Sequence, residues 1–445
     1  MLPPYIAKAV PNPETNRAPW YTNTAPSYGG TFLWIAFYIA IARDTLPYAG
    51  LSVCLAGIAV ASVLCYALYY YAPAMLGMKT GFPLYVVGSS TFGTRGGYLF
   101  PGLLMGMLQI GWFAVGTYLS TRFILNGFGS SAAPGSVPFI LIGVAWGYTM
   151  AWVGVMGIRY VGKLALLLNA IPLIMILVVF AQVRGGIPAY APDPAVYSPF
   201  IAFTMMIQVI IGFFATAGAA GTDFGMNNRN ARDVRLGGIV GIAIASFIAA
   251  ALPLLSVAGA RVLFPDKVAV LTYDNVLAGI GGPVASAMFF LFAIASIAPA
   301  CFCAFIAGNS LSTMIPGVKR MSSTMAGMTV AIVLAVTGVA ENLVGFFTIV
   351  GASFGPICGA MTADYLLAGR KWAGPREGVN IAGYGAWAIG FLVGILPFLP
   401  IPQAARVWVQ PAVVYSFVTG FVVYIILAKA GLEPKTVKLA AAAKS

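Results

Sequence analysis

The sequence contains no histidine, and charged residues are scarce. The lack of histidine excludes a histidine general base, a Ser-His-Asp triad, a histidine-ligated haem and an H-E-x-x-H zinc site. Only 8% of the residues are charged and 60% are hydrophobic, whereas about a quarter of the residues in soluble domains are charged. Together with a mean hydropathy of +0.92, this composition predicts an all-α polytopic membrane protein.

Cysteine is also rare, and no CxxC pair occurs. The five cysteines all lie in apolar stretches, a pattern that predicts free, buried thiols rather than disulfides or metal ligands. They are Cys54, Cys65, Cys301, Cys303 and Cys358. The first thirty residues lack the basic start, apolar segment and cleavage site of a signal peptide. We therefore expect no cleaved leader, no metal site and no cofactor.

Long apolar runs, in contrast, fill the chain. A helix that crosses a bilayer needs roughly 20 mostly apolar residues, and hydropathy predicts twelve such spans. The predicted spans are 31–46, 50–77, 100–126, 137–156, 163–181, 199–222, 236–260, 283–312, 322–340, 344–369, 379–400 and 408–428. The first is short because Arg43, Asp44 and Pro47 end its apolar run.

The basic residues indicate the orientation of these spans. With a cytoplasmic N-terminus, 18 of the 24 lysines and arginines lie inside, which follows the positive-inside rule. The six outside are Arg43, Arg122, Arg184, Arg261, Lys267 and Arg406. We expect a multi-pass protein of the plasma (inner) membrane with both termini cytoplasmic. The net charge of +13 then needs no nucleic-acid partner.

Glycine, proline and small polar residues cluster inside four spans. The clusters are Gly212–Gly221 in the sixth span, Ser296–Cys301 in the eighth, Gly351–Pro356 in the tenth and, more weakly, Ala36–Ala40 in the first. Each cluster is also explained by close packing of small residues between helices. Breaks in the first and sixth spans, which are five apart, are however typical of transporters built from two inverted repeats.

This interpretation divides the chain into five parts. We predict a cytoplasmic tail at 1–30, a first five-helix repeat at 31–181 and a second, inverted five-helix repeat at 199–369. Two additional transmembrane helices at 379–428 and a cytoplasmic tail at 429–445 complete the chain. Glycine and proline in the tenth span, at Gly351, Gly355 and Pro356, predict a helix that bends as a gate. The loop carrying Arg229, Arg232, Asp233 and Arg235 predicts a polar network at the inner face.

One predicted span carries an amide and an indole in otherwise apolar sequence. Gln109 and Trp112 are three positions apart, so that they share one helix face. An indole stacks on flat rings, and a primary amide both donates and accepts hydrogen bonds. Taken singly, Gln109 fits an interhelical hydrogen bond and Trp112 fits a core aromatic. Together with the sixth-span cluster, they predict a polar pocket with aromatic walls inside the membrane.

Several segments resemble one transporter family. These segments are Phe92–Gly97, Gln109–Phe113, Gly221–Phe224 with Arg229–Ala231, and Ala363–Leu366 with Arg370. Their order and spacing resemble nucleobase:cation symporter family 1, the family of cytosine, purine and hydantoin permeases. The resemblance implies the leucine-transporter fold, a five-plus-five inverted repeat with two C-terminal helices. It also implies import of a nucleobase or related planar ring by alternating access, coupled to a cation.

The resemblance further assigns the substrate-binding residues. It implies that Trp112 and Phe214 form two aromatic walls, with Phe213 as the alternative second wall. Gln109 and Thr216 fall at positions that bond to the ring. The remaining lining residues that it implies are Ala36, Ala40 and Cys301.

The coupling ion is less well defined. The resemblance implies a cation site formed by Ala36 and Ile39 of the first span with Ser296, Pro299 and Ala300 of the eighth. Sodium prefers oxygen ligands, but Pro299 and Ala300 stand where sodium-coupled members have hydroxyl residues. Proton coupling needs an ionisable group inside the membrane, for which the candidates are Asp44, Asp223, Glu341 and Asp364. All four lie near span ends, where contact with water or a nearby arginine also explains them. Na⁺, H⁺ and no coupling ion all remain open.

Two other functions are compatible with the sequence. One is a permease of the same fold for an amino acid, a vitamin-like ring or another small organic solute. The other is an intramembrane enzyme with Asp223 or Asp364 as a base or Cys301 as a nucleophile, which lacks any paired-carboxylate or Cys-His arrangement. The sequence predicts a transporter rather than an enzyme, and it leaves the base and the oligomeric state undetermined.

Overall fold

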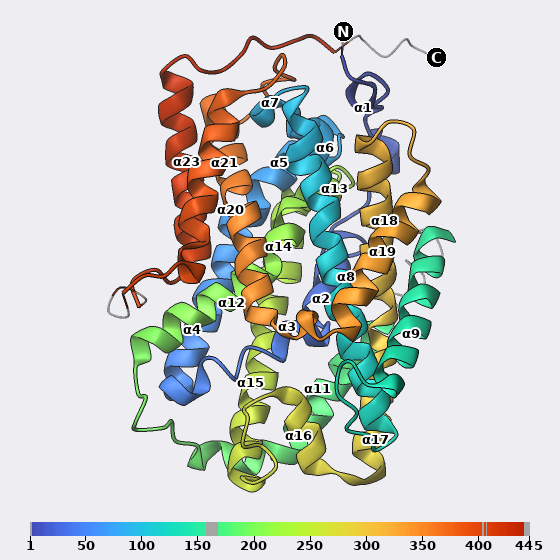
Figure 1. The fold of residues 1–445 in the computed structure, drawn as a ribbon. Coiled ribbons are helices and arrows are strands. Elements are labelled where there is room, and N and C mark those ends of the chain that lie inside the picture. Colours follow the sequence, from blue (N-terminus) through green and yellow to red (C-terminus); the bar gives the residue numbers. More distant parts are fainter. Residues whose placement is uncertain (1, 157–167, 403–404, 406, 440–445) are drawn as a thin grey trace.

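The computed structural model describes residues 2–156, 168–402, 405 and 407–439, and its secondary structure is helical (Figure 1). Nine of the described helices are long and apolar enough to cross a membrane. Four consist of a single labelled helix: Val137–Met156 (α9), Pro199–Ala219 (α12), Leu343–Leu367 (α20) and Ala412–Lys429 (α23). Two extend beyond one labelled helix: Gly96–Gly127 includes α8 (Leu104–Gly127), and Ala170–Ala189 includes α11 (Ala170–Val183). Three include two labelled helices each: Leu51–Thr80 has α4 (Leu51–Leu64) and α5 (Tyr71–Thr80), Ala231–Leu263 has α14 (Ala231–Gly238) and α15 (Ala245–Leu263), and Gly282–Met314 has α17 (Gly282–Ala295) and α18 (Ile297–Met314). Two shorter apolar helices are α19 (Arg320–Val336) and α21 (Ile381–Gly394). The molecule is a multi-pass membrane protein, and the number of twelve spans stays a prediction.

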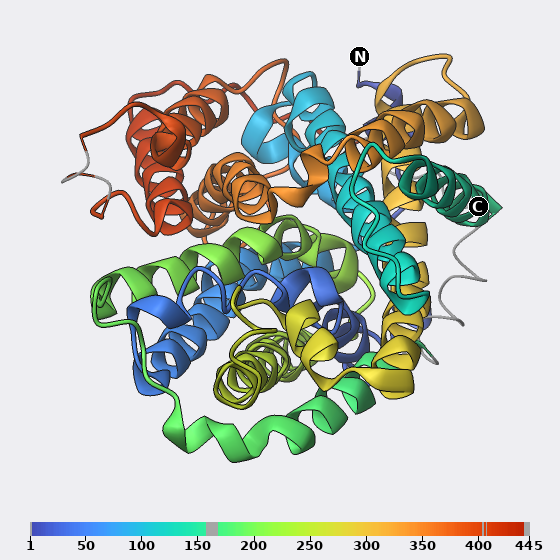
Figure 2. The same cartoon turned by 60° about the horizontal axis from the view of Figure 1, so that its bottom comes forward.

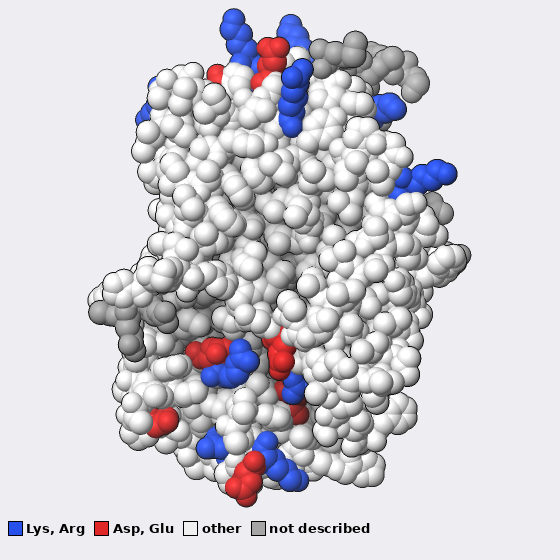
Figure 3. Space-filling view, viewed as in Figure 1, with Lys and Arg blue, Asp and Glu red and all other residues white. Residues whose placement is uncertain are grey.

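Charged side chains avoid the middle of the molecule. On the face shown in Figure 3, charged side chains of both signs occur at the upper end and in the lower part, and most of those at the upper end are lysines and arginines. An uncharged band separates the two regions. Because ionised groups are costly inside lipid, this distribution fits a bilayer around the middle of the bundle.

The first span begins earlier than predicted, and it leaves the α-helical conformation at two places. Helix α2 (Thr24–Phe32) is followed by Leu33 and Trp34, and α3 (Ile35–Tyr38) then resumes the helix for one turn. Trp34 has extended backbone angles, φ −72° and ψ 130°. The predicted start at 31 was therefore wrong, whereas the end of α3 at Tyr38 falls within the predicted break at Ala36–Ala40. Hydropathy missed α2 because it counts the polar side chains of this helix against a membrane span. In the fold such side chains donate to the helix's own backbone, as Thr31 does to the Ser27 carbonyl at 3.1 Å.

The sixth span is interrupted at the C-terminal end of its predicted cluster. Helix α12 runs without a break through Gly212–Gly218, and α13 (Gly221–Gly225) follows after Ala220, which lies within the predicted Gly212–Gly221. The earlier glycines serve close packing. A Cβ atom on Gly212 would lie 2.7 Å from the Phe347 carbonyl oxygen, and one on Gly218 would lie 2.6 Å from the Tyr69 Cβ. Helix proximity, rather than irregular backbone, therefore requires Gly212 and Gly218.

The tenth span is one continuous helix, so its cluster does not break it, and bending as a gate stays a prediction. Pro356 lies inside α20 and has no N–H group for the Ala352 carbonyl. The Ser416 hydroxyl of α23 lies 3.4 Å from that carbonyl and 2.8 Å from the Gly390 carbonyl, the nearer acceptor. In the eighth span, by contrast, Ser296 separates α17 from α18, within the predicted Ser296–Cys301 cluster. The predicted start of the fifth span at 163 lies outside the described residues.

The helices pack in groups that are not consecutive in sequence. Helix α4 contacts α12, whereas α18 contacts both α8 and α9, and α9 also contacts α19. Figure 2 shows the blue and green helices on one side, the teal and gold helices on another, and the orange to red C-terminal helices beside them. Pairing early spans with later ones in this way is what two interlocked repeats produce.

The predicted N-terminal tail is largely packed against the bundle. The Arg17 guanidinium donates to the Met78 carbonyl at 2.8 Å, and the Thr24 hydroxyl donates to Asn228 Oδ1 at 2.6 Å. Residues 24–30 already belong to α2. This part of the chain therefore packs against the end of the second span and the loop after α13.

Candidate functional site

Aromatic rings from three segments surround Trp112 of α8, the helix labelled near the centre of the view in Figure 1. Its indole is 4% exposed. The ring centroids lie 5.7 Å from Trp34, 5.1 Å from Phe213, 4.9 Å from Phe346 and 5.4 Å from Phe347. We call these five residues the ring cluster. It joins the break in the first span to α12 and to the start of α20.

The polar side chains at and beside the ring cluster come from two helices, α8 and α12. Trp112 Nε1 donates to Thr216 Oγ1 of α12 at 3.1 Å, which fixes the edge of the indole. The Thr216 oxygen accepts this bond, and the Thr216 hydroxyl donates no hydrogen bond within the part of the chain that the structure describes. Gln109 lies one turn from Trp112, and Met105 Sδ, at 3.7 Å, is the one partner of its amide among the described residues. A thioether is a weak acceptor, so this amide retains most of its bonding capacity.

Of the two candidates for the second wall, Phe213 faces Trp112. Phe214 is fully buried on another face of α12, where it stacks on Phe32 with centroids 5.3 Å apart and planes at 17°. Neighbouring positions on a helix point about 100° apart, so the two phenylalanines cannot share one face. The structure thus places Phe213 at the ring cluster and Phe214 against α2.

The other predicted lining residues are one cysteine and two alanines. Cys301 Sγ donates to the Met150 carbonyl of α9 at 3.6 Å, so that this thiol faces α9. Ala36 of α3 and Ala40 are buried in the first span and carry no polar side-chain atom. The structure brings Gln109, Trp112, Phe213 and Thr216 together, and their role in binding stays a prediction.

Sequence reasoning missed three members of the ring cluster, namely Trp34, Phe346 and Phe347. Aromatic residues in apolar spans are most often lipid-facing or core residues, so their side chains gave no signal. The sequence signal for Phe346 is the glycine at position 111. A Cβ atom there would lie 2.4 Å from the Phe346 ring, so the ring needs a glycine opposite it.

Comparison with known proteins identifies the family. The sequence profile of permeases for cytosine/purines, uracil, thiamine and allantoin matches residues 10–400. The chain belongs to this permease family. A cytosine permease of Escherichia coli O157:H7 is 26% identical over 317 residues, which are 67% of this chain and 66% of that protein. The match thus spans slightly less than two thirds of the relative's length.

Solved structures agree on the fold. The inward-facing conformation of Mhp1 covers 99% of this chain and 96% of its own, with a TM-score of 0.73 and 16% identity. Mhp1, described as a nucleobase-cation-symport-1 family transporter, was also solved in a closed conformation with bromovinylhydantoin bound. That structure has a TM-score of 0.67 and 18% identity, and it covers 97% of this chain and 96% of its own. This permease therefore has the leucine-transporter-like fold.

The eighth span of the permease offers few oxygen ligands for a cation. The Ser296 hydroxyl donates to the Phe292 carbonyl at 2.9 Å, within its own helix segment. Pro299 and Ala300 add no side-chain oxygen, although Pro299 also lacks the N–H that would bond the Ala295 carbonyl. The remaining oxygen ligands of the predicted cation site are backbone carbonyls near Ala36 and Ile39.

The four candidate carboxylates differ in their surroundings. Asp44 pairs with Arg43 at 3.2 Å, and the Glu341 side chain is 60% exposed. Asp364 is buried and pairs with Arg376 at 2.9 Å. Asp223 of α13 accepts the Leu84 N–H at 3.2 Å, and no ion pair of Asp223 occurs among the described residues. It is the one candidate without a basic partner at hand.

A buried ionic network, which sequence reasoning did not predict, joins three distant segments at the upper end. Arg376 bonds Asp364 of α20 at 2.9 Å and Glu433, beyond α23, at 2.9 Å. The Ser90 hydroxyl donates to the second Asp364 oxygen at 2.6 Å. Burial by itself lowers the pKa of the Arg376 guanidinium, but the Asp364 and Glu433 carboxylates outweigh it and raise the pKa above the usual value. Arg376 therefore stays charged.

The predicted loop network is smaller. Arg229 pairs with Asp233 at 2.8 Å, and Asp233 also accepts the Trp20 N–H at 3.4 Å. At the opposite end of the bundle, Arg122 of α8 pairs with Asp274 of α16 (Tyr273–Ile280) at 2.9 Å. These contacts tie loops and short helices to the spans.

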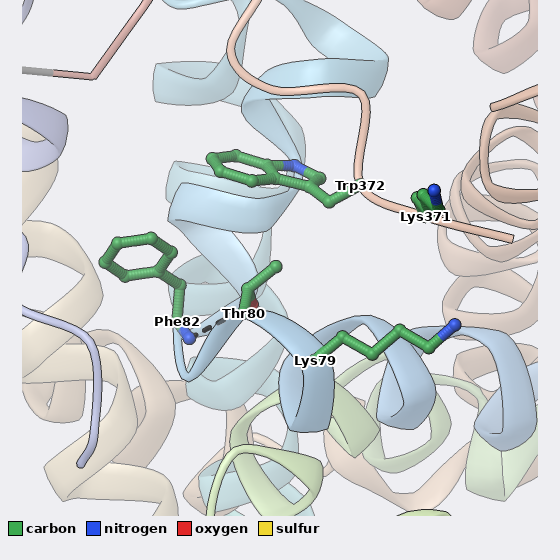
Figure 4. A pocket seen from close by; sticks show the side chains of 5 residues that line it. All are labelled: Lys79, Thr80, Phe82, Lys371 and Trp372. Atoms are coloured by element: carbon green, nitrogen blue, oxygen red, sulfur yellow. Dashed lines mark hydrogen bonds between the residues drawn. The ribbon is translucent and has the colours of Figure 1, made fainter.

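A surface groove of about 400 Å³ lies at the upper end (Figure 4). Its lining residues are Lys79, Thr80, Phe82, Lys371 and Trp372. The Phe82 and Trp372 rings are 5.8 Å apart, and the Trp372 N–H is bonded to the Val87 carbonyl at 3.0 Å. The two lysines suit an uncharged ligand ring poorly. The Phe82 and Trp372 rings pack on each other, and the Trp372 N–H is already bonded. The groove shares no residue with the ring cluster.

Proposed function

We propose that this permease imports a nucleobase, or a related planar heteroaromatic ring, by alternating access. The inner or plasma membrane is its proposed location, with both termini in the cytoplasm. The observation that carries the proposal is the buried Trp112 indole, held by Thr216 at 3.1 Å beside the under-bonded Gln109 amide. The family profile and the cytosine permease similarity support the same substrate class.

Recognition would combine stacking with hydrogen bonding. Stacking of a base on an aromatic side chain gives about 1 to 3 kcal/mol and tolerates different rings. Selection therefore depends on polar groups, because a wrong ring leaves buried donors or acceptors unpaired. Gln109 donates and accepts, and the Thr216 hydroxyl can donate. These two groups match the mixed edge of a lactam or amidine.

Access to Trp112 requires one neighbouring ring to move. Phe347 is the ring-cluster member closest to parallel with Trp112, at an interplanar angle of 32°. We propose that a ligand ring takes the place of Phe347 on the face of Trp112. Phe347 belongs to α20, so the ligand contact is linked directly to the tenth span.

We further propose that uptake does not depend on sodium. Pro299 and Ala300 provide no hydroxyl ligand, and the Ser296 hydroxyl is bonded within its own helix segment. Asp223 is the carboxylate that best fits a proton-coupling group, because it lies at the interrupted sixth span without a basic partner among the described residues. We therefore propose that uptake of the ring is coupled to the movement of H⁺.

The decisive experiment is uptake of a radiolabelled panel in cells without their own permeases. The panel contains cytosine, uracil, hypoxanthine, allantoin and thiamine. We expect saturable uptake of at least one ring and loss of more than about 90% of it in Trp112→Ala, since a stacking wall of about 1 to 3 kcal/mol is removed. Trp146→Ala, in α9 and outside the ring cluster, is the matched control. Normal uptake by Trp112→Ala would refute the site, and uptake of none of the panel would refute the function.

A further inference from the structure

Trp34 occupies an unusual place in the backbone. It lies between α2 and α3, where the first span leaves the helical conformation, and its side chain is 7% exposed. Its ring centroid is 5.7 Å from Trp112 and 6.4 Å from Phe213. The break in the first span thus places a second indole against the aromatic residues that form the candidate site.

The close contact with α8 fixes the orientation of this indole. A Cβ atom on Gly116 would lie 3.0 Å from Trp34 Cζ2 and 3.7 Å from Cη2, so the benzene edge of the indole faces Gly116. The ring nitrogen Nε1 shares a bonded carbon with Cζ2, so the N–H lies next to this edge. Gly116 follows Trp112 by one helical turn, which puts this edge beside the same stripe of α8 that carries the proposed stacking wall.

The Trp34 N–H differs from the indole N–H groups of Trp112 and Trp387. Trp34 Nε1 is buried and has no hydrogen-bond partner among the described residues. Trp112 donates to Thr216 at 3.1 Å and Trp387 donates to the Ser353 carbonyl at 3.0 Å. A buried indole N–H normally finds an acceptor, and leaving it unbonded costs about 1 to 3 kcal/mol. The group therefore has unused capacity to donate one hydrogen bond.

We propose that the Trp34 N–H donates to an acceptor atom of the transported ring and determines specificity. This inference rests on the proposed function and adds the atom that the ring must present, a carbonyl oxygen or an unprotonated ring nitrogen. With the Thr216 hydroxyl, it supplies two donors, while the Gln109 amide supplies a donor and an acceptor. The site selects rings that carry acceptors on the edge facing the break in the first span.

The test compares variants that differ in the donor. Trp34→Phe keeps an aromatic ring and removes the N–H, Trp34→His restores a ring N–H, and Trp146→Phe removes another unpartnered indole N–H outside the ring cluster. The probes are cytosine and uracil against 2-thiocytosine, 2-thiouracil and 4-thiouracil, whose sulfur is a weaker acceptor. Competition against labelled uptake gives the apparent affinities. Ligand-induced shifts of the melting temperature of purified protein give a readout independent of transport.

We expect Trp34→Phe to weaken binding of the oxygen-containing ring about 3- to 10-fold. The difference between oxygen and sulfur analogues should shrink by a similar factor, Trp34→His should recover part of both effects, and Trp146→Phe should match the unmodified protein. Equal loss in Trp34→Phe and Trp34→His, with the oxygen-to-sulfur ratio unchanged, would show that Trp34 acts by packing and would overturn the proposal. Unchanged affinity in Trp34→Phe would do the same.

These outcomes separate the two proposals. Uptake by the unmodified protein that is lost in Trp112→Ala but insensitive to Trp34→Phe leaves the proposed function standing and removes the Trp34 contact. Absence of binding and uptake of every ring by the unmodified protein removes both. A Trp34→Phe protein that fails to fold is recognised by its melting temperature without ligand, and Trp34→His against Trp34→Tyr then decides whether the ring N–H matters.

Discussion

At the scale of single residues, the important feature is a hydrogen bond between two side chains of the candidate site. Trp112 and Thr216 are far apart in sequence but are joined at 3.1 Å inside the bundle. The indole supplies a flat face, and the threonine keeps that face in one orientation. The same bond leaves the hydroxyl hydrogen available to a ligand, so one residue serves both positioning and recognition.

This arrangement predicts that Thr216→Val, a change of similar shape, impairs the site. The variant leaves the Trp112 N–H unbonded and removes a donor, which costs about 1 to 3 kcal/mol. We expect a rise of about 5- to 100-fold in the KM for the transported ring. Thr216→Ser retains the hydroxyl and should remain close to the unmodified protein. A KM unchanged in Thr216→Val would argue against a role for this hydrogen bond.

At the scale of helices, small residues and prolines have different roles in different spans. In α12 Gly212 permits contact with α20, and in α20 the carbonyl freed by Pro356 lies 3.4 Å from the Ser416 hydroxyl of α23. At Ser296 the eighth span is interrupted, but its hydroxyl is bonded within its own segment. A break in a span is therefore not by itself an ion site.

The eighth span predicts the response of uptake to sodium. Replacing sodium with potassium or choline at constant pH should change the initial rate of uptake by less than about twofold, because hard-cation oxygen ligands are missing at Pro299 and Ala300. Lithium should likewise have no effect. A rate that falls at least tenfold without sodium would show that backbone carbonyls suffice for the site, contrary to the proposal.

At the scale of the whole molecule, a buried network fixes the two C-terminal helices to the repeats. Arg376 connects α20 with the segment after α23, and Ser90 brings in the segment before α8. Ser90, Asp364 and Glu433 are distant in sequence, so their connection depends on the complete fold. Breaking one partner leaves an uncompensated buried charge.

We therefore expect Arg376→Ala to destabilise the protein by about 3 to 5 kcal/mol. The measurement is the melting temperature of the detergent-solubilised protein, which should fall clearly. Arg43→Ala provides the control, since the Arg43–Asp44 pair is exposed and should contribute about 0 to 1 kcal/mol. Equal effects of the two changes would contradict a structural role for the network.

The sequence by itself determined the membrane class, the approximate positions of most spans, and the residue types of the site. Apolar run length and the amide and indole of 105–119 carry this information locally, because lipid burial and helical periodicity act on neighbouring residues. The tertiary structure decided which residues meet. It placed Phe213 rather than Phe214 at Trp112, added an interruption of the first span at Trp34, and assembled the Arg376 network. These outcomes depend on contacts between distant helices, and no local pattern contains them.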